Sequence, residues 1–210
     1  DNSTNNNNIE LDVYSPTSNI PLGGNGAPCV VIFATSFAQP STLKKVLEER
    51  ILRRSMDVST GRMVVPPTQL VCISTVGTER TTKLPYSMKN FMSGGSYETR
   101  RQIEEVVMGI VQNRIVDEQH PAMDYTILKL NGDKFLPHDS SSSSIPSLQI
   151  RPGDILDDPT TIDTAIDVTI QAIMKQPFAR NATFCISGRS NEGISNSEKD
   201  PSVAQNYWQE

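Results

Sequence analysis

A tyrosine and an arginine form the clearest candidate for a catalytic pair in this chain. Tyr97 and Arg101 stand four positions apart in a segment with helical periodicity, and a helix would place the phenol and the guanidinium on one face. A cation beside a phenol stabilises the phenolate, the form that accepts a proton in acid–base catalysis. Arginine stays protonated up to about pH 12, so it does not relay a proton as lysine does. The pair therefore predicts electrostatic support for a phenolate.

The same segment also has a purely structural interpretation. Arg100 and Arg101 stand four residues before Glu104 and Glu105, which is the spacing of ion pairs on the surface of a helix. Tyr97 would then cap the start of the helix. On this interpretation Arg100, Glu104 and Glu105 face solvent. The apolar side of the helix would consist of Ile103, Val106, Val107, Ile110 and Val111.

The elements that must position these residues alternate between apolar runs and amphipathic segments. Runs rich in β-branched residues predict strands covered on both faces, at 29–34, 70–73, 125–130 and 183–186, with a further short strand at 148–150. Helical periodicity marks 40–54, 98–114 and 161–176, and Ser41 is the expected N-cap of the first helix. Strands that alternate with helices of this length predict right-handed crossovers and a parallel sheet. The fold class is therefore α/β.

The domain organisation follows from where turn-forming residues gather. Residues 1–28 are predicted to form an extended or disordered arm, and 189–210 a polar C-terminal tail. The range between them, 29–188, fits one domain, with a serine-rich loop at 139–146. The polar segment 75–96 is long enough to shape a cleft at the carboxyl end of its strand, where open α/β sheets bind ligands. Within it, Tyr86 and Lys89 are interpreted as surface loop or cleft rim.

Charge and hydropathy exclude several classes of function. The formal net charge of −5 argues against nucleic acid and against electrostatic docking on anionic lipid. No apolar run approaches the roughly 20 residues that span a bilayer. The three cysteines, Cys29, Cys72 and Cys185, lie inside apolar runs. This position predicts buried, reduced thiols and a reducing compartment.

A metal site is not expected. His120 and His138 are 18 residues apart and have no cysteine or paired carboxylates beside them. The acidic run of Asp154, Asp157 and Asp158 is interpreted as a helix entry, in which acids complement the dipole of the helix after residue 161.

Several motifs in a fixed order resemble the second half of the atypical short-chain dehydrogenases/reductases. In that family a strand ending in Ser is followed by a helix with Tyr-x-x-x-Lys, and then by a strand reading Tyr-Thr-Ile-x-Arg or Lys. The matching segments here are 31–34, 70–77, 97–105, 125–129, 163–176 and 179–184. The resemblance covers about 31–188 and implies a Rossmann-like, NAD(P)-binding type of domain.

The resemblance also implies roles for particular residues. Ser74, Tyr97 and Arg101 match the family's catalytic Ser, Tyr and Lys, with Arg in place of Lys as a departure that puts proton relay in doubt. The candidate dinucleotide contacts are Ala34, Thr35, Thr75 and Lys129.

The glycine fingerprint of the family is missing. No Gly-x-x-Gly-x-x-Gly stands between a first strand and a helix, and the Gly23–Gly26 cluster precedes a strand instead. The family's first three strands have no counterpart, so the sheet is expected to be incomplete and 29–34 to form an unpaired edge. Either an upstream part or a partner subunit would complete it. No bound cofactor is expected, with NAD(P) expected only if an upstream half exists.

Three functions stay open on these grounds. The first is a non-catalytic scaffold or accessory subunit, derived from the reductase fold, that docks on a larger complex. The second is an NAD(P)-dependent oxidoreductase whose nucleotide-binding half lies outside this sequence or is supplied by a partner. The third is a regulator that binds a small molecule in the cleft. The branch of the family that the chain most resembles includes plastid photosystem-assembly and tetrapyrrole-related proteins, which implies the stroma or the stromal face of the thylakoid.

Overall fold

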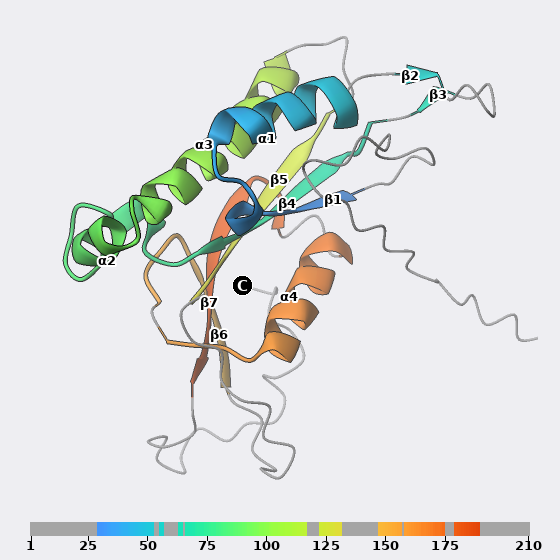
Figure 1. Ribbon diagram of the computed structural model, residues 1–210. Coiled ribbons are helices and arrows are strands. Elements are labelled where there is room, and N and C mark those ends of the chain that lie inside the picture. The colour runs from blue at the N-terminus through green and yellow to red at the C-terminus, as the bar shows by residue number, and fades with distance from the viewer. Residues whose placement is uncertain are drawn as a thin grey trace, which may run out of the picture.

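A five-stranded sheet forms the centre of the computed structural model (Figure 1). Its strands, in spatial order, are β1 Cys29–Phe33, β4 Gln69–Thr75, β5 Asp124–Leu130, β7 Ala182–Arg189 and β6 Ser147–Pro152. The first four run parallel, and β6 is antiparallel to β7. The predicted α/β, Rossmann-like class is confirmed, and the four apolar runs form the parallel strands.

The structure describes most of the central part of the chain. The described ranges are 29–52, 55–56, 63–64, 66–116, 122–131, 147–156, 158–174 and 179–189. The predicted arm, the serine-rich loop, the Gly23–Gly26 cluster, both histidines, Asp157 and all of the predicted tail after Arg189 lie outside these ranges.

The sheet places β4 between β1 and β5, which explains its continuous apolar sequence. Val71 of β4 pairs with Val31 of β1 on one side and with Thr126 of β5 on the other. Leu70, Val71 and Cys72 are fully buried because helices cover both faces of the strand. The strand β1 lies at an edge of the sheet, as predicted.

Helices cover the two faces of the sheet unequally. One face carries α1 Pro40–Val46, which continues into the π-helical turn η2 Leu47–Ile51, together with α3 Ser96–Val116 (Figure 1). The other face carries α4 Ile162–Met174. Each face has its own apolar core, the first built around Leu43, Leu47 and Ile103, and the second around Val71, Leu128 and Val168.

The first helix begins at Pro40, the first residue of the predicted range, but its N-cap differs from the prediction. Its N-cap is Gln39 rather than Ser41, and Pro40 occupies the first turn. Proline is favoured there because its missing N–H would have no partner in the helix, and its fixed φ suits the helix. The prediction of Ser41 as N-cap is therefore wrong, although the position of the helix is confirmed.

Smaller elements fill the connection between β4 and α3. The segment contains a 3-10 turn, η3 Thr78–Arg80, and a short helix, α2 Tyr86–Met92. Tyr86 is buried, so the interpretation of Tyr86 and Lys89 as surface loop is wrong for the tyrosine. A two-stranded antiparallel pair, β2 Ser55–Met56 and β3 Met63–Val64, stands apart from the main sheet.

The cysteines and the helices bear on the predictions of free thiols and of no membrane-spanning run. All three thiols are free, with Cys72 and Cys185 buried, and burial raises the pKa of Cys29 to about 12. A thiol with so high a pKa is almost entirely protonated at neutral pH and is a poor nucleophile. Among the described residues, no helix has the length and hydropathy needed to cross a bilayer.

Candidate functional site

A fully buried lysine stands at the carboxyl end of β5 and organises the polar interior. The Nζ atom of Lys129 lies 2.7 Å from Glu79 Oε1, 3.1 Å from Glu104 Oε2 and 3.9 Å from Asp154 Oδ2. It also donates a hydrogen bond of 2.9 Å to Thr78 Oγ1. We call these residues, together with Ser74, the buried polar cluster, of which Glu79 is the exposed member, with 51% of its side chain exposed. It occupies the edge of the sheet at which open α/β folds bind ligands.

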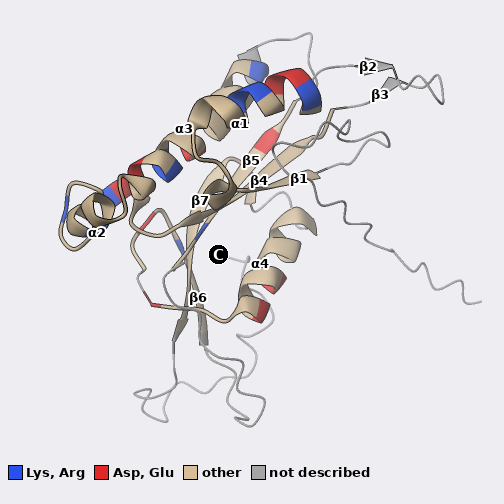
Figure 2. Cartoon of the chain, in the orientation of Figure 1, with Lys and Arg blue, Asp and Glu red and all other residues tan. Residues whose placement is uncertain are grey.

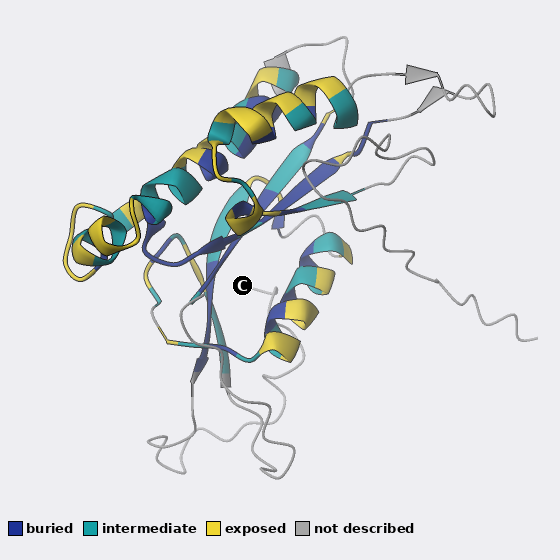
Figure 3. Ribbon diagram, in the orientation of Figure 1, coloured by how far each residue is buried: buried dark blue, intermediate teal, exposed yellow. Residues whose placement is uncertain are grey.

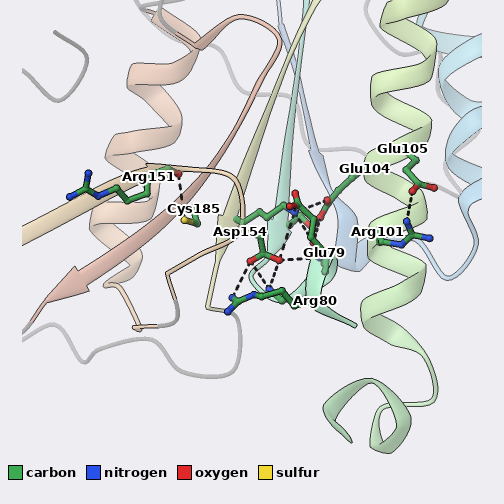
Figure 4. Close-up of polar contacts among 12 residues, drawn as sticks. Glu79, Arg80, Arg101, Glu104, Glu105, Arg151, Asp154 and Cys185 are labelled. Atoms are coloured by element: carbon green, nitrogen blue, oxygen red, sulfur yellow. Dashed lines mark hydrogen bonds and ion pairs between the residues drawn. The ribbon is translucent and has the colours of Figure 1, made fainter. Parts of the chain in front are cut away.

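The alternation of side chains along β5 explains why Lys129 points inward. Ile127 packs in the core under α1 and α3, and Leu128 packs in the core under α4. Lys129 follows at the next position, so it returns to the α3 side of the sheet. Glu104 of α3 meets it there, and Figure 4 shows Glu104 pointing toward Glu79 and Asp154.

Asp154 ties the loop after β6 to the turn after β4. Its carboxylate accepts hydrogen bonds from the backbone N–H of Gly77, at 2.7 and 2.9 Å to its two oxygens, and from that of Glu79 at 3.0 Å. The guanidinium of Arg80 adds a charged contact at 3.3 Å (Figure 4). Asp154 is thus a buried anchor in a nest of backbone donors. The interpretation of Asp154 as a helix-entry acid is wrong.

The close approach at this anchor requires a glycine. Gly77 has a φ of +91°, and a Cβ built on it would lie 1.9 Å from Cδ1 of Tyr86. Tyr86 packs edge-to-face on Tyr97, with ring centroids 5.9 Å apart, and Arg80 lies 4.4 Å above the Tyr86 ring. The glycine is therefore required both by the positive φ of the turn and by the close packing of the Tyr86 ring against the backbone.

Glu104 is held inside by hydrogen bonds and charge. Ser74 Oγ donates a hydrogen bond to Glu104 Oε1, and Thr78 Oγ1 donates another at 2.9 Å. Burial raises the pKa of Glu104, against the lowering effect of the Lys129 charge and of these hydrogen bonds. The prediction that Glu104 faces solvent is wrong, because the carboxylate is needed to pair with the buried ammonium.

Lys129 remains charged in this setting. Burial alone would lower the pKa of Lys129, but the charge of Glu104 and the contacts with Glu79 and Asp154 outweigh burial and raise it above its ordinary value of 10.5. A charged ammonium among three carboxylates is the arrangement that makes burial of either charge tolerable.

The raised pKa of Glu104 predicts a specific pH dependence of stability. Because the folded state holds this proton more tightly than the unfolded state, the contribution of Glu104 is complete below its ordinary pKa of 4.5. It is lost as the pH rises through the folded pKa. We expect the free energy of unfolding of the native chain to fall, relative to that of Glu104→Gln, as the pH is raised from 4 to neutrality. Urea titrations at a series of pH values measure this, and parallel curves for the two proteins would contradict it.

The residues predicted to form a catalytic triad occupy three different settings. Ser74 lies in the buried polar cluster, where its hydroxyl donates to Glu104. Tyr97 is buried against Tyr86 in the second position of α3. Arg101 lies on the outer surface of α3, paired with Glu98 at 2.8 Å and with Glu105 at 2.6 Å (Figure 4). The structure thus places Ser74 and Tyr97 on the inner side of α3 and turns Arg101 away.

The cation beside Tyr97 is Arg100 rather than Arg101. Its guanidinium lies 5.5 Å from the centroid of the Tyr97 ring and donates a hydrogen bond of 2.8 Å to Thr75 Oγ1. Of the surface pairs expected along α3, the Arg101–Glu105 pair is present, but Arg100 turns to Thr75 while Glu104 turns to Lys129.

The four candidate dinucleotide contacts are also separated. Ala34 is buried in the turn η1 Ala34–Ser36 after β1, and Thr35 beside it is exposed. Thr75, at the end of β4, accepts a hydrogen bond from Arg100 at its hydroxyl, and Lys129 is the centre of the buried polar cluster.

The residues that sequence reasoning missed are Glu104, Asp154, Glu79 and Gly77. A signal for one of them was present: Lys129 interrupts an apolar strand, and a buried lysine requires a carboxylate partner. No local spacing identifies that partner, because Asp154 is 77 positions from the backbone that it binds. In the described ranges, no group of three or more His, Cys, Asp or Glu side chains is placed to hold a metal ion.

Known proteins offer only distant similarity. No family model matches the chain, and no curated protein matches it. Among solved structures, it is similar to a wide-type short-chain dehydrogenase/reductase from Veillonella parvula in complex with NADP, with 12% identity, a TM-score of 0.45, and coverage of 81% of this chain and 67% of that chain. An ethylated short-chain dehydrogenase/reductase from the same organism gives 14% identity, a TM-score of 0.42, and coverage of 82% and 67%. These identities are too low to transfer the role of any residue.

Proposed function

We propose that this chain is a non-catalytic accessory subunit, built on a reductase-like fold, that docks on a larger complex. The observation that carries the proposal is the ion pairing of Lys129. Its ammonium contacts Glu79, Glu104 and Asp154 and donates to Thr78. The position at which an open α/β sheet would bind a ligand is thus filled by the chain's own side chains.

The hydroxyl groups at this edge also support a structural role. A general acid or base must come within hydrogen-bond reach of its substrate. The Ser74 hydroxyl instead donates a hydrogen bond to Glu104, and Tyr97 is buried beside Arg100 and against Tyr86. These contacts hold α3 and the 75–84 connection against the sheet. The plastid location implied by the resemblance stays a prediction.

A second candidate is an NAD(P)-dependent oxidoreductase whose nucleotide-binding half comes from elsewhere. The observation that favours it is the stacking of Arg100 near the ring of Tyr97, beside Thr75 at the carboxyl end of β4. A guanidinium in that position would stabilise a phenolate after proton transfer. This candidate requires Tyr97 to become accessible to a substrate.

Calorimetric titration of the full 210-residue chain with NADPH and with NADH separates the candidates. The accessory role predicts no saturable binding below about 1 mM, since the sequence has no Gly-x-x-Gly-x-x-Gly fingerprint whose backbone could approach a pyrophosphate. Micromolar binding would contradict it. Turnover that Tyr97→Phe abolishes would establish the oxidoreductase, and binding without turnover would establish a nucleotide-sensing regulator.

A further inference from the structure

The strand β1 is an edge strand without the usual protection. In the part of the chain that the structure describes, no strand pairs with its outer side (Figure 1). Such an edge presents unpaired N–H and C=O groups to other strands, so proteins protect edges with charged residues or proline. The opposite edge, β6, carries Arg151 and Pro152. The strand β1 reads Cys-Val-Val-Ile-Phe, and Figure 2 shows no charge on it. We therefore expect another strand to cover it.

The apolar core under α4 is also incompletely covered at β1. Cys29 and Val31 belong to this core but stay partly exposed, and Phe33, which follows on the same face, is 53% exposed. Val71 and Leu128, further inside the same core, are fully buried. Figure 3 shows the same difference, with β1 partly exposed and β4 buried. A strand beside β1 that presents apolar side chains on the α4 face would complete this burial.

One segment upstream of β1, outside the described residues, has the sequence that this position requires. Residues 9–14 read Ile-Glu-Leu-Asp-Val-Tyr, with apolar side chains at the odd positions and two acids between them. A period of two is typical of a strand with one buried face and one exposed face. The acids would also give the new edge of the sheet the charge that β1 lacks.

The connection between this segment and β1 selects the direction of the added strand. Residues 15–28 contain Pro16, Pro21 and Pro28 together with three glycines, a composition that disfavours a helix. A parallel neighbour needs a crossover, which is usually a helix, whereas an antiparallel neighbour needs only a loop. The pairing of β6 with β7 shows that this sheet accepts an antiparallel strand at its edge.

The covalent link favours a segment of this chain over a separate partner. The connection of 14 residues, 15–28, is rich in glycine and would span roughly 20 Å. A link of this length gives the segment an effective concentration on the order of 1 mM at β1. A second copy of the chain, or another protein, would need a comparable concentration in solution to compete for the same edge.

We propose that residues 9–14 pair with β1 as an additional antiparallel strand and close this edge of the main sheet. In the register that covers the most exposed side chain of β1, Phe33 lies opposite Ile9, and Cys29 lies opposite Val13. The strand shields the backbone of β1 from other chains. The inference does not rest on the proposed function, because it concerns the edge of the sheet and not the buried polar cluster.

Hydrogen exchange of the full 210-residue chain, measured by mass spectrometry, tests the proposal. The amides of 9–14 should exchange at least about tenfold more slowly than those of an unstructured chain. The double change Leu11→Asp with Val13→Asp removes apolar contacts with the α4 face, so it should abolish this protection and speed exchange in 29–33. The matched control, Glu10→Ser with Asp12→Ser, changes only the exposed face and should keep the protection.

Three results would overturn the proposal. The first is exchange of 9–14 at the unstructured rate in the native chain. The second is an equal loss of protection in the two double variants, since the apolar face would then have no part in the pairing. The third is protection of 29–33 that rises with protein concentration and accompanies a dimer in analytical ultracentrifugation, which would assign the edge to a second copy of this chain.

Discussion

Lys129→Met is expected to destabilise the fold by about 3–5 kcal/mol, because it leaves the buried carboxylate of Glu104 without its cation and leaves Asp154 with Arg80 as its one remaining cation among the described residues. The loss should grow as the pH rises from 5 to 8, since protonation of Glu104 relieves the unpaired charge at the lower pH. Chemical denaturation monitored by circular dichroism measures both effects.

Two further variants make this result specific. Lys129→Met combined with Glu104→Gln should recover part of the lost stability, because the second change removes the unpaired buried charge of Glu104. Lys44→Met changes an exposed lysine whose contact with Glu48 is long, at 3.9 Å, and should alter stability by no more than about 0.5 kcal/mol. If Lys129→Met cost no more than Lys44→Met, the cluster would have no structural role.

Gly77→Ala is the second change with a large expected effect, and it should lower the free energy of unfolding by roughly 2–5 kcal/mol. The new methyl group would strain a backbone at φ +91° and collide with the ring of Tyr86 at 1.9 Å. The ring has little room to retreat, since Tyr97 and Arg80 lie against it. The same denaturation experiment measures the loss.

Gly95→Ala is the matched control. Gly95 has a φ of +84°, close to that of Gly77, but a Cβ there would meet nothing within 4 Å. It should therefore cost only the backbone strain, about 1–2 kcal/mol. Equal losses at the two glycines would show that the Tyr86 contact contributes nothing.

The five strands of the main sheet and the helices α1, α3 and α4 were predictable from local sequence. A run such as Val30–Val31–Ile32 is typical of a strand, and the helix of 98–114 has one apolar side, so each segment favours its own conformation. The short helix α2 was not predicted, because its apolar residues are exposed and give no inward-facing pattern.

The polar interior was predictable only in part. Arg100 and Glu104 stand at the spacing of a surface pair, and nothing in that spacing reveals that each has a partner on β4 or β5. Arg101 matched the spacing of a catalytic cation, yet its two glutamate neighbours on α3 hold it outside. Contacts between distant segments decide which polar residue of a helix turns inward, and local periodicity carries no information about them.

Amine acylation followed by mass spectrometry tests most directly whether the buried polar cluster is closed. In the native chain Lys129 should stay unmodified while the exposed Lys44 and Lys45 react, and all three should react once the chain is unfolded. Acylation of native Lys129 at the rate of Lys44 would mean that the carboxyl end of β5 is open to solvent, and the proposal that this site serves the fold rather than a ligand would be wrong.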